Sequence, residues 1–100
     1  MGAPLGQVDS TVGQIRLRYW ASARAAAGVD QDVLEITGPV SLQVVRDRAK
    51  SLHGSSARFA AVLDSCSVLV GDRPVASSDP GDVIVEAGQT VEFLPPFAGG

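Results

Sequence analysis

The sequence predicts a single α+β domain in which one main helix packs on one face of a mixed β-sheet. Two segments alternate apolar and polar residues as half-buried strands do: Gln14–Trp20 near the start and Thr90–Leu94 near the end. Between them, Ser41–His53 carries apolar residues at helical spacing and is followed by Gly54. The chain has 100 residues and no internal repeat or linker, which is the size of one domain.

The chain divides into three parts. Residues 1–13 contain Gly, Pro and Ser without periodicity, and we expect a flexible arm that the fold does not need. Residues 14–94 contain all the periodic segments and form the predicted domain. Residues 95–100 begin with Pro-Pro, which has no N–H for a sheet or helix, and end in Gly-Gly, so we expect an extended tail.

The first predicted strand, Gln14–Trp20, has one apolar face and one polar face. Trp20 lies on the polar side, where two interpretations remain open. An aromatic residue at a strand end covers the edge of a core, which is the commoner case, or it contacts a partner.

The next residues predict a turn and a second strand. Ala21–Ala27 favours helix but is short and is stopped by Gly28, so we expect a single turn or loop. Arg24 is then a solvated or ion-paired loop residue. Asp32–Thr37 alternates again and is predicted to pair with the first strand.

The main helix has clear start and stop signals. Ser41 is the predicted N-cap, and His53, the only histidine, lies at the other end. We expect His53 to be exposed and to act as a local cap rather than as a catalyst. A second, shorter helix is predicted over Ala57–Asp64.

The following segment predicts short strands and turns. Cys66 precedes the strand Ser67–Val70, and the neighbouring Asp64 argues against a reactive thiolate, so Cys66 is interpreted as a small buried residue. Turns are predicted at residues 71–74 and 77–82, with a short strand at 83–85. The predicted inward residues are Ile15, Leu17, Leu34, Ile36, Leu42, Val45, Leu52, Val68, Val91 and Phe93. This order of elements suits a β-grasp.

Composition excludes several classes of function. The net charge is −3, whereas nucleic-acid binders carry clustered positive charge. No apolar run is long enough to span a membrane, and the N-terminus lacks the features of a secretory signal, so we expect a cytoplasmic protein. One His and one Cys make neither a disulfide nor an evident metal or catalytic cluster. The chain is therefore predicted to have no complete catalytic site of its own.

The tail is the segment with the clearest functional signal. Pro95-Pro96 is stiff, while Ala98, Gly99 and Gly100 have almost no side-chain bulk. Fully extended, the six residues from Pro95 reach roughly 20 Å at about 3.3 Å per residue. Such a tail fits a narrow channel and presents the Gly100 carboxylate to chemistry in another protein.

The ending Leu94-Pro95-Pro96-Phe97-Ala98-Gly99-Gly100 resembles that of the small subunits of molybdopterin synthase, the MoaD type within the ubiquitin-like MoaD/ThiS sulfur carriers. A second motif is similar too: an aromatic pair, then Ala, Arg and Gly, at Tyr19, Trp20, Ala21, Arg24 and Gly28. The resemblance covers roughly residues 14–100, and Pro-Pro favours the molybdopterin branch over the thiamin branch. Residues 77–87 depart from the pattern because they are longer than usual.

The resemblance implies a ubiquitin-like β-grasp and a sulfur-carrier chemistry. Gly100 is expected to be adenylated and converted to a thiocarboxylate that donates sulfur for the dithiolene of molybdopterin. Leu94, Pro95, Pro96, Phe97, Ala98 and Gly99 are expected to serve tail access and docking. No cofactor or metal is expected to stay bound, and ATP is used by the activating partner. The implied partners are a MoaE-like large subunit, as a heterotetramer, and a MoeB-like adenylating enzyme.

Three other functions stay open at this point. The chain is a sulfur carrier for cysteine or thiamin synthesis, or a ubiquitin-like modifier joined to lysines through Gly100, or a β-grasp binding module with an idle tail. A ladder of conjugates above the free protein distinguishes the modifier. Unchanged function without Gly99 and Gly100 distinguishes the binding module.

Overall fold

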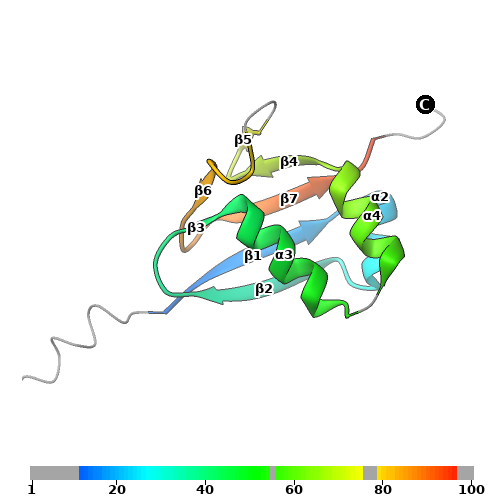
Figure 1. The fold of residues 1–100 in the computed structure, drawn as a ribbon, viewed down its shortest axis with the longest axis horizontal. Coiled ribbons are helices and arrows are strands. Elements are labelled where there is room, and N and C mark those ends of the chain that lie inside the picture. The colour runs from blue at the N-terminus through cyan, green and yellow to red at the C-terminus, as the bar shows by residue number, and fades with distance from the viewer. Residues whose placement is uncertain (1–11, 55, 76–78, 97–100) are drawn as a thin grey trace, which may run out of the picture.

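The computed structural model describes residues 12–54, 56–75 and 79–96, and its centre is a five-stranded sheet of order β2-β1-β7-β4-β5 (Figure 1). A separate two-stranded sheet is made by β3 and β6. The strands are β1 (Gly13–Tyr19), β2 (Gln31–Ile36), β3 (Val40–Ser41), β4 (Ser67–Val70), β5 (Arg73–Pro74), β6 (Ile84–Val85) and β7 (Thr90–Leu94). The helices are α2 (Ala21–Ala27), α3 (Leu42–Leu52) and α4 (Ala57–Ser65).

The two ends of the predicted domain meet in the middle of the main sheet. β1 pairs antiparallel with β2 and parallel with β7, from Arg16↔Thr90 to Tyr19↔Phe93. β7 in turn pairs antiparallel with β4. The sheet is therefore mixed, as predicted, and its two central strands come from opposite ends of the sequence. The first two strands begin and end one residue earlier than the alternation indicated.

The helices lie on one face of the sheet, with α3 crossing it and with α2 and α4 at the end where β1 and β7 finish (Figure 1). Ser41 caps α3 as predicted, because its Oγ accepts a hydrogen bond from the Val44 N–H at 3.1 Å. Ser56 caps α4 in the same way through the Phe59 N–H. The predicted α+β class with one main helix on one face is confirmed.

The core fills the space between the helices and the sheet. Nine of the ten predicted inward residues are buried, and the exception is Leu52, which is 51% exposed. Leu52 is the last residue of α3 and lies on the flank of the helix, beside the buried stripe formed by Leu42, Val45 and Ala49. Further buried apolar residues are Tyr19, Ala23, Ala49, Phe59, Leu63, Val70 and Val85.

The segment expected to be a loop after β1 is the helix α2, so Arg24 lies on a helix rather than in a loop. Tertiary packing explains the difference, because α2 contacts α4 and the Ala23 side chain is fully buried. Gly28 ends the helix in the left-handed conformation with φ 79°, as its sequence position indicated. Ala21 also has a positive φ of 49°, an uncommon conformation for a residue with a Cβ.

The prediction that His53 is exposed is wrong. Its side chain is 15% exposed, and Nε2 lies 2.7 Å from Oδ2 of Asp32 on β2. The Tyr19 hydroxyl donates to the same Asp32 oxygen at 2.8 Å, and the His53 ring lies against Phe59 with centroids 4.4 Å apart. The backbone N–H of His53 does cap α3 through the carbonyl of Lys50, so the local role at the helix end is confirmed.

Two further differences concern short strands. The turn predicted at residues 71–74 includes β5, which pairs with β4. The strand predicted at 83–85 is β6, and its partner β3 was not predicted. Each of these strands has two residues, too short for alternation to reveal. Among the described residues, no helix is both long and apolar enough to cross a lipid bilayer.

Candidate functional site

The root of the tail is held by the central strand β7. Hydrogen-bonded pairing on both sides, with β1 and β4, fixes β7 up to Leu94, whose partner in β4 is Ser67. Pro95 is buried, and Pro96 is the first exposed residue after the sheet. The chain therefore leaves the domain at Pro96, one residue later than Pro-Pro alone indicates. Phe97, Ala98, Gly99 and Gly100 lie outside the described residues.

Beside this root lies a cluster formed by Arg18, Trp20 and Glu92. The Trp20 indole N–H donates to Glu92 Oε1 at 2.9 Å, and the Arg18 guanidinium carbon lies 4.8 Å from the Trp20 ring centroid. The Trp20 backbone N–H donates to the carbonyl of Phe93 at 3.2 Å, which ties the cluster to β7. Trp20 remains 39% exposed.

The cluster lies on the face of the sheet opposite the helices. Tyr19 and Phe93 alternate with its members along β1 and β7, and both are buried under the helices. The parallel register places Arg18 opposite Glu92, so the two charges are cross-strand neighbours. The result is a partly exposed aromatic ring between a cation and an anion, next to the point where the tail leaves. Both earlier interpretations of Trp20 remain compatible with this position.

On the β4 side of the root lies a hollow of about 380 Å³, lined by Cys66–Leu69, Pro74, Val75 and Leu94. Cys66 is partly buried, less than predicted, and its thiol donates to the carbonyl of Val62 at 3.2 Å. Burial raises the pKa of the Cys66 thiol to about 11, and the positive charge of Arg46 offsets only part of that effect. The thiol is therefore protonated at neutral pH, in keeping with the prediction that Cys66 is not a nucleophile.

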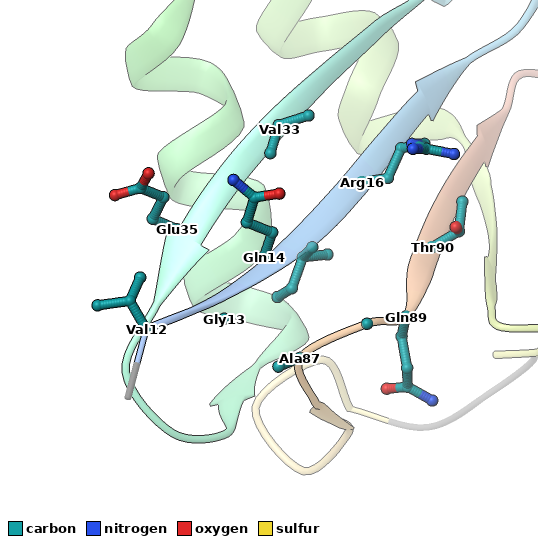
Figure 2. A pocket seen from close by; sticks show the side chains of 11 residues that line it. Val12, Gly13, Gln14, Arg16, Val33, Glu35, Ala87, Gln89 and Thr90 are labelled. Carbon is teal, nitrogen blue, oxygen red and sulfur yellow. The ribbon is translucent and has the colours of Figure 1, made fainter. Parts of the chain in front are cut away.

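A second hollow lies at the far end of the sheet from Leu94, where β1 and β7 begin (Figure 2). Its volume is about 850 Å³, and Arg16 and Glu35 are its charged side chains. It is open, and its one hydroxyl-bearing lining residue, Thr90, has no Cys or His beside it in the lining to act as a nucleophile or base. In the described ranges 12–54, 56–75 and 79–96, no three His, Cys, Asp or Glu side chains gather as a metal site requires.

Of the predicted site residues, the structure therefore places Leu94, Pro95 and Pro96 together at the end of β7. It adds Arg18 and Glu92, which sequence reasoning missed. Arg18 could have been found from the sequence, because residues two apart on a strand share a face and Arg18 is two residues before Trp20. Glu92 is 72 residues from Trp20, and only the parallel β1–β7 register brings them together.

No protein-family model and no curated protein sequence matches the chain. Solved structures with a similar fold do match. A putative molybdopterin converting factor subunit 1 from Pyrococcus furiosus has a TM-score of 0.67 and 22% identity, covering 84% of this chain and 98% of that one. SAMP1 from Haloferax volcanii has a TM-score of 0.65 and 20% identity, covering 88% and 100%.

A third similar structure is a protein–protein complex of subunits 1 and 2 of the molybdopterin-converting factor from Helicobacter pylori, with a TM-score of 0.59 and 14% identity. The match covers 87% of this chain and 99% of the matched chain. At these identities the similarity concerns the fold, and it confirms the predicted ubiquitin-like β-grasp.

Proposed function

We propose that this protein is a sulfur carrier of the molybdopterin synthase small-subunit type, with Gly100 as the reacting residue. The observation that carries the proposal is the way the chain leaves the fold. A central strand, paired on both sides, ends at Leu94 and releases a Pro-Pro segment that is followed in the sequence by Phe-Ala-Gly-Gly. Rigid anchoring of the root and a narrow end are what delivery of a C-terminal group into a partner's channel requires.

The proposed chemistry takes place at the carboxylate of Gly100. A carboxylate is a poor electrophile, so a MoeB-like partner uses ATP to form an acyl-adenylate and releases pyrophosphate. Sulfide from a sulfur donor then displaces AMP, which leaves the thiocarboxylate. The thiocarboxylate sulfur attacks a carbon of the pterin intermediate and displaces an oxygen leaving group from that carbon. Water then cleaves the bond between the Gly100 carbonyl carbon and sulfur, which leaves the sulfur on the pterin and restores the carboxylate. A dithiolene has two sulfurs, so one product needs two such cycles.

The proposed large-subunit partner is MoaE-like, in a cytoplasmic heterotetramer. The Helicobacter pylori complex, whose subunit 1 shares this fold, supports a partner of that kind. For the docking surface we propose Arg18, Trp20 and Leu94 together with Phe97. Trp and Arg are the residue types that most often dominate binding energy at interfaces, and this cluster borders the root of the tail.

The first experiment is intact-mass analysis of the protein purified from its own cells. We expect a fraction heavier by the difference between sulfur and oxygen, located by fragmentation to Gly100. Deletion of Gly100, or Gly99→Val, should leave the thermal unfolding midpoint unchanged and abolish dithiolene formation. Deletion of Gly2 and Gly2→Val are the matched controls at the other end of the chain. Full synthase activity without Gly100 would refute the proposal.

Docking is tested separately from chemistry. Trp20→Ala and Phe97→Ala in thiocarboxylated protein should raise KM for the carrier and leave turnover at saturating carrier nearly unchanged, because they remove uniform binding. Val29→Ala is the matched control, since Val29 is an apolar residue of similar exposure, 43%, outside the cluster. An unchanged KM for Trp20→Ala would remove Trp20 from the docking surface.

A second candidate function is protein modification, in which a lysine amine replaces sulfide and Gly100 ends in an isopeptide bond. The similarity to SAMP1, described as a small archaeal modifier protein in a second Haloferax volcanii structure, favours keeping it. The two candidates share adenylation and differ in the acceptor. Tagged protein expressed in its own cells should give a ladder of conjugates that depends on Gly100 if modification is correct, and only free or thiocarboxylated protein if it is not.

A further inference from the structure

The strand β2 is an edge of the main sheet. It pairs with β1 along its whole length, and within the described part of the chain no strand lies on its other side. Edge strands present unpaired backbone groups that pair readily with another strand, so folded proteins usually protect them. Among the described residues, the outward backbone groups of β2 receive one hydrogen bond, from Arg48 Nη1 to the Glu35 carbonyl at 2.8 Å, and the strand carries the charged side chains of Asp32 and Glu35.

That contact identifies which peptide groups face outward. Arg48 belongs to α3 and approaches β2 from the side away from β1, so the carbonyl of Glu35 points out of the sheet. The carbonyl of Asp30 points the other way, because it accepts from the Tyr19 N–H at the end of β1. Backbone groups alternate along a strand, so the N–H and C=O groups of Gln31, Val33 and Glu35 all face outward.

Apolar side chains flank this edge on both faces of the sheet. Val33 is 45% exposed on the open face. On the helical face, Val44 and Leu52 of α3 are 40% and 51% exposed. They lie four residues on either side of Arg48, so all three share the flank of α3 that reaches β2. An unpaired edge strand bordered by exposed apolar residues on both faces of the sheet is unusual for a monomeric protein.

We propose that a second copy of this chain pairs with β2, antiparallel, about a two-fold axis through Val33. In this register Val33 lies opposite Val33 of the second copy, and Gln31 lies opposite the second copy's Glu35. The amide of Gln31 donates to that carboxylate, and symmetry provides the pair twice. The edge sequence is therefore self-complementary.

Other registers are less favourable. Moving the axis by two residues, to Glu35, places two carboxylates directly opposite each other, which destabilises a pair of strands. With the axis at Val33, no like charges are opposed, because Asp32 lies opposite Leu34 and Asp30 opposite Ile36. The Glu35 carbonyl then accepts a hydrogen bond from the Gln31 N–H of the second copy instead of from Arg48. The released Arg48 guanidinium lies between the second copy's Asp30 and Asp32.

The assembly is compatible with the use of the tail. A two-fold axis perpendicular to the sheet keeps both α3 helices on one face, where the Val44 and Leu52 flanks of the two copies approach each other. The same axis reverses β7, so the two tails leave at opposite ends of one continuous sheet. The Trp20 cluster of each copy lies at the end of β1 and on β7, away from β2, and stays outside the new contact. The inference does not depend on the proposed function.

The experiment measures the dimer dissociation constant by sedimentation velocity over a concentration series. Gln31→Lys places opposite charges across the axis twice, and Gln31→Glu places like charges there twice. Two cross-strand pairs predict that the dimer dissociation constant changes by about 2- to 30-fold. Gln31→Lys should lower it and Gln31→Glu should raise it, and salt should reduce the effect of Gln31→Lys. Ser67→Lys and Ser67→Glu are the matched controls, because Ser67 is an exposed strand residue on the far side of β7.

A second variant tests the axis itself. In a Cys66→Ala background, Val33→Cys should form a disulfide-linked dimer under mild oxidation, since opposed Cα atoms in an antiparallel pair lie within bridging distance. Ser67→Cys in the same background should not. A wild-type protein that sediments as a monomer at all concentrations would overturn the proposal. So would a dimer in which Lys and Glu at position 31 shift the constant in the same direction.

Discussion

Tyr19 is the only tyrosine, and its environment predicts an unusual response to alkaline pH. The side chain is 2% exposed, and its hydroxyl donates to Asp32 Oδ2 at 2.8 Å. Burial is the larger cause, and the hydrogen bond and charge of Asp32 add to it, so the pKa of Tyr19 is raised far above its usual value. The folded protein therefore keeps this proton at a pH where the unfolded chain loses it.

The sign of the effect on stability follows from proton binding. Above a pH of about 10, where an unfolded tyrosine ionises, the folded state holds more protons than the unfolded state, so the free energy of unfolding falls as pH rises. One proton gives a slope approaching about 1.4 kcal/mol per pH unit. Cys66 acts in the same direction at a somewhat lower pH, because its pKa is also raised, to about 11. The measurement is therefore made in a Cys66→Ala background.

The assay is near-ultraviolet phenolate absorbance and far-ultraviolet circular dichroism during one alkaline titration. We expect no phenolate in the folded protein, and the signal should appear together with unfolding. In urea the midpoint of phenolate formation should lie at a pH of about 10, the pKa of a free tyrosine. Tyr19→Phe should lose the absorbance and the extra slope above pH 10. At neutral pH Tyr19→Phe should lower the free energy of unfolding by about 1.5 kcal/mol, because one hydrogen bond to the Asp32 carboxylate is lost while the contact of His53 with Asp32 remains. A midpoint near 10 in protein that is still folded would refute this reasoning.

Three further predictions concern local features of the fold. Gly13→Ala should destabilise the protein by about 1–3 kcal/mol in urea unfolding, because the new Cβ meets the Cβ of Ala87, and adding Ala87→Gly should restore most of the loss. Ala21→Gly should raise the free energy of unfolding by up to about 1 kcal/mol, since φ is 49° there, and a decrease of that size would contradict it. Native Cys66 should react with a thiol reagent at pH 8 far more slowly than in urea, because burial raises its pKa to about 11, and equal rates would show an accessible thiolate.

Much of the candidate site was predictable because its signals are local. Two prolines prevent further pairing wherever they occur, and Ala-Gly-Gly is narrow in any fold. Alternation assigned Ile15 and Leu17 to the buried face without knowledge of the neighbouring strands. The α3 cap was predicted because a serine and the N–H three residues later lie within one turn.

The sequence alone therefore determined the α+β class, the face of each long strand and the end of strand pairing at Pro95-Pro96, because each depends on residues a few positions apart. Only the tertiary structure decided the helical state of α2, the burial of His53 and the contact of Trp20 with Glu92. It also decided that β2, rather than β1 or β7, is an edge. Periodicity specifies which side of an element is apolar, but it carries no information about which element lies on that side.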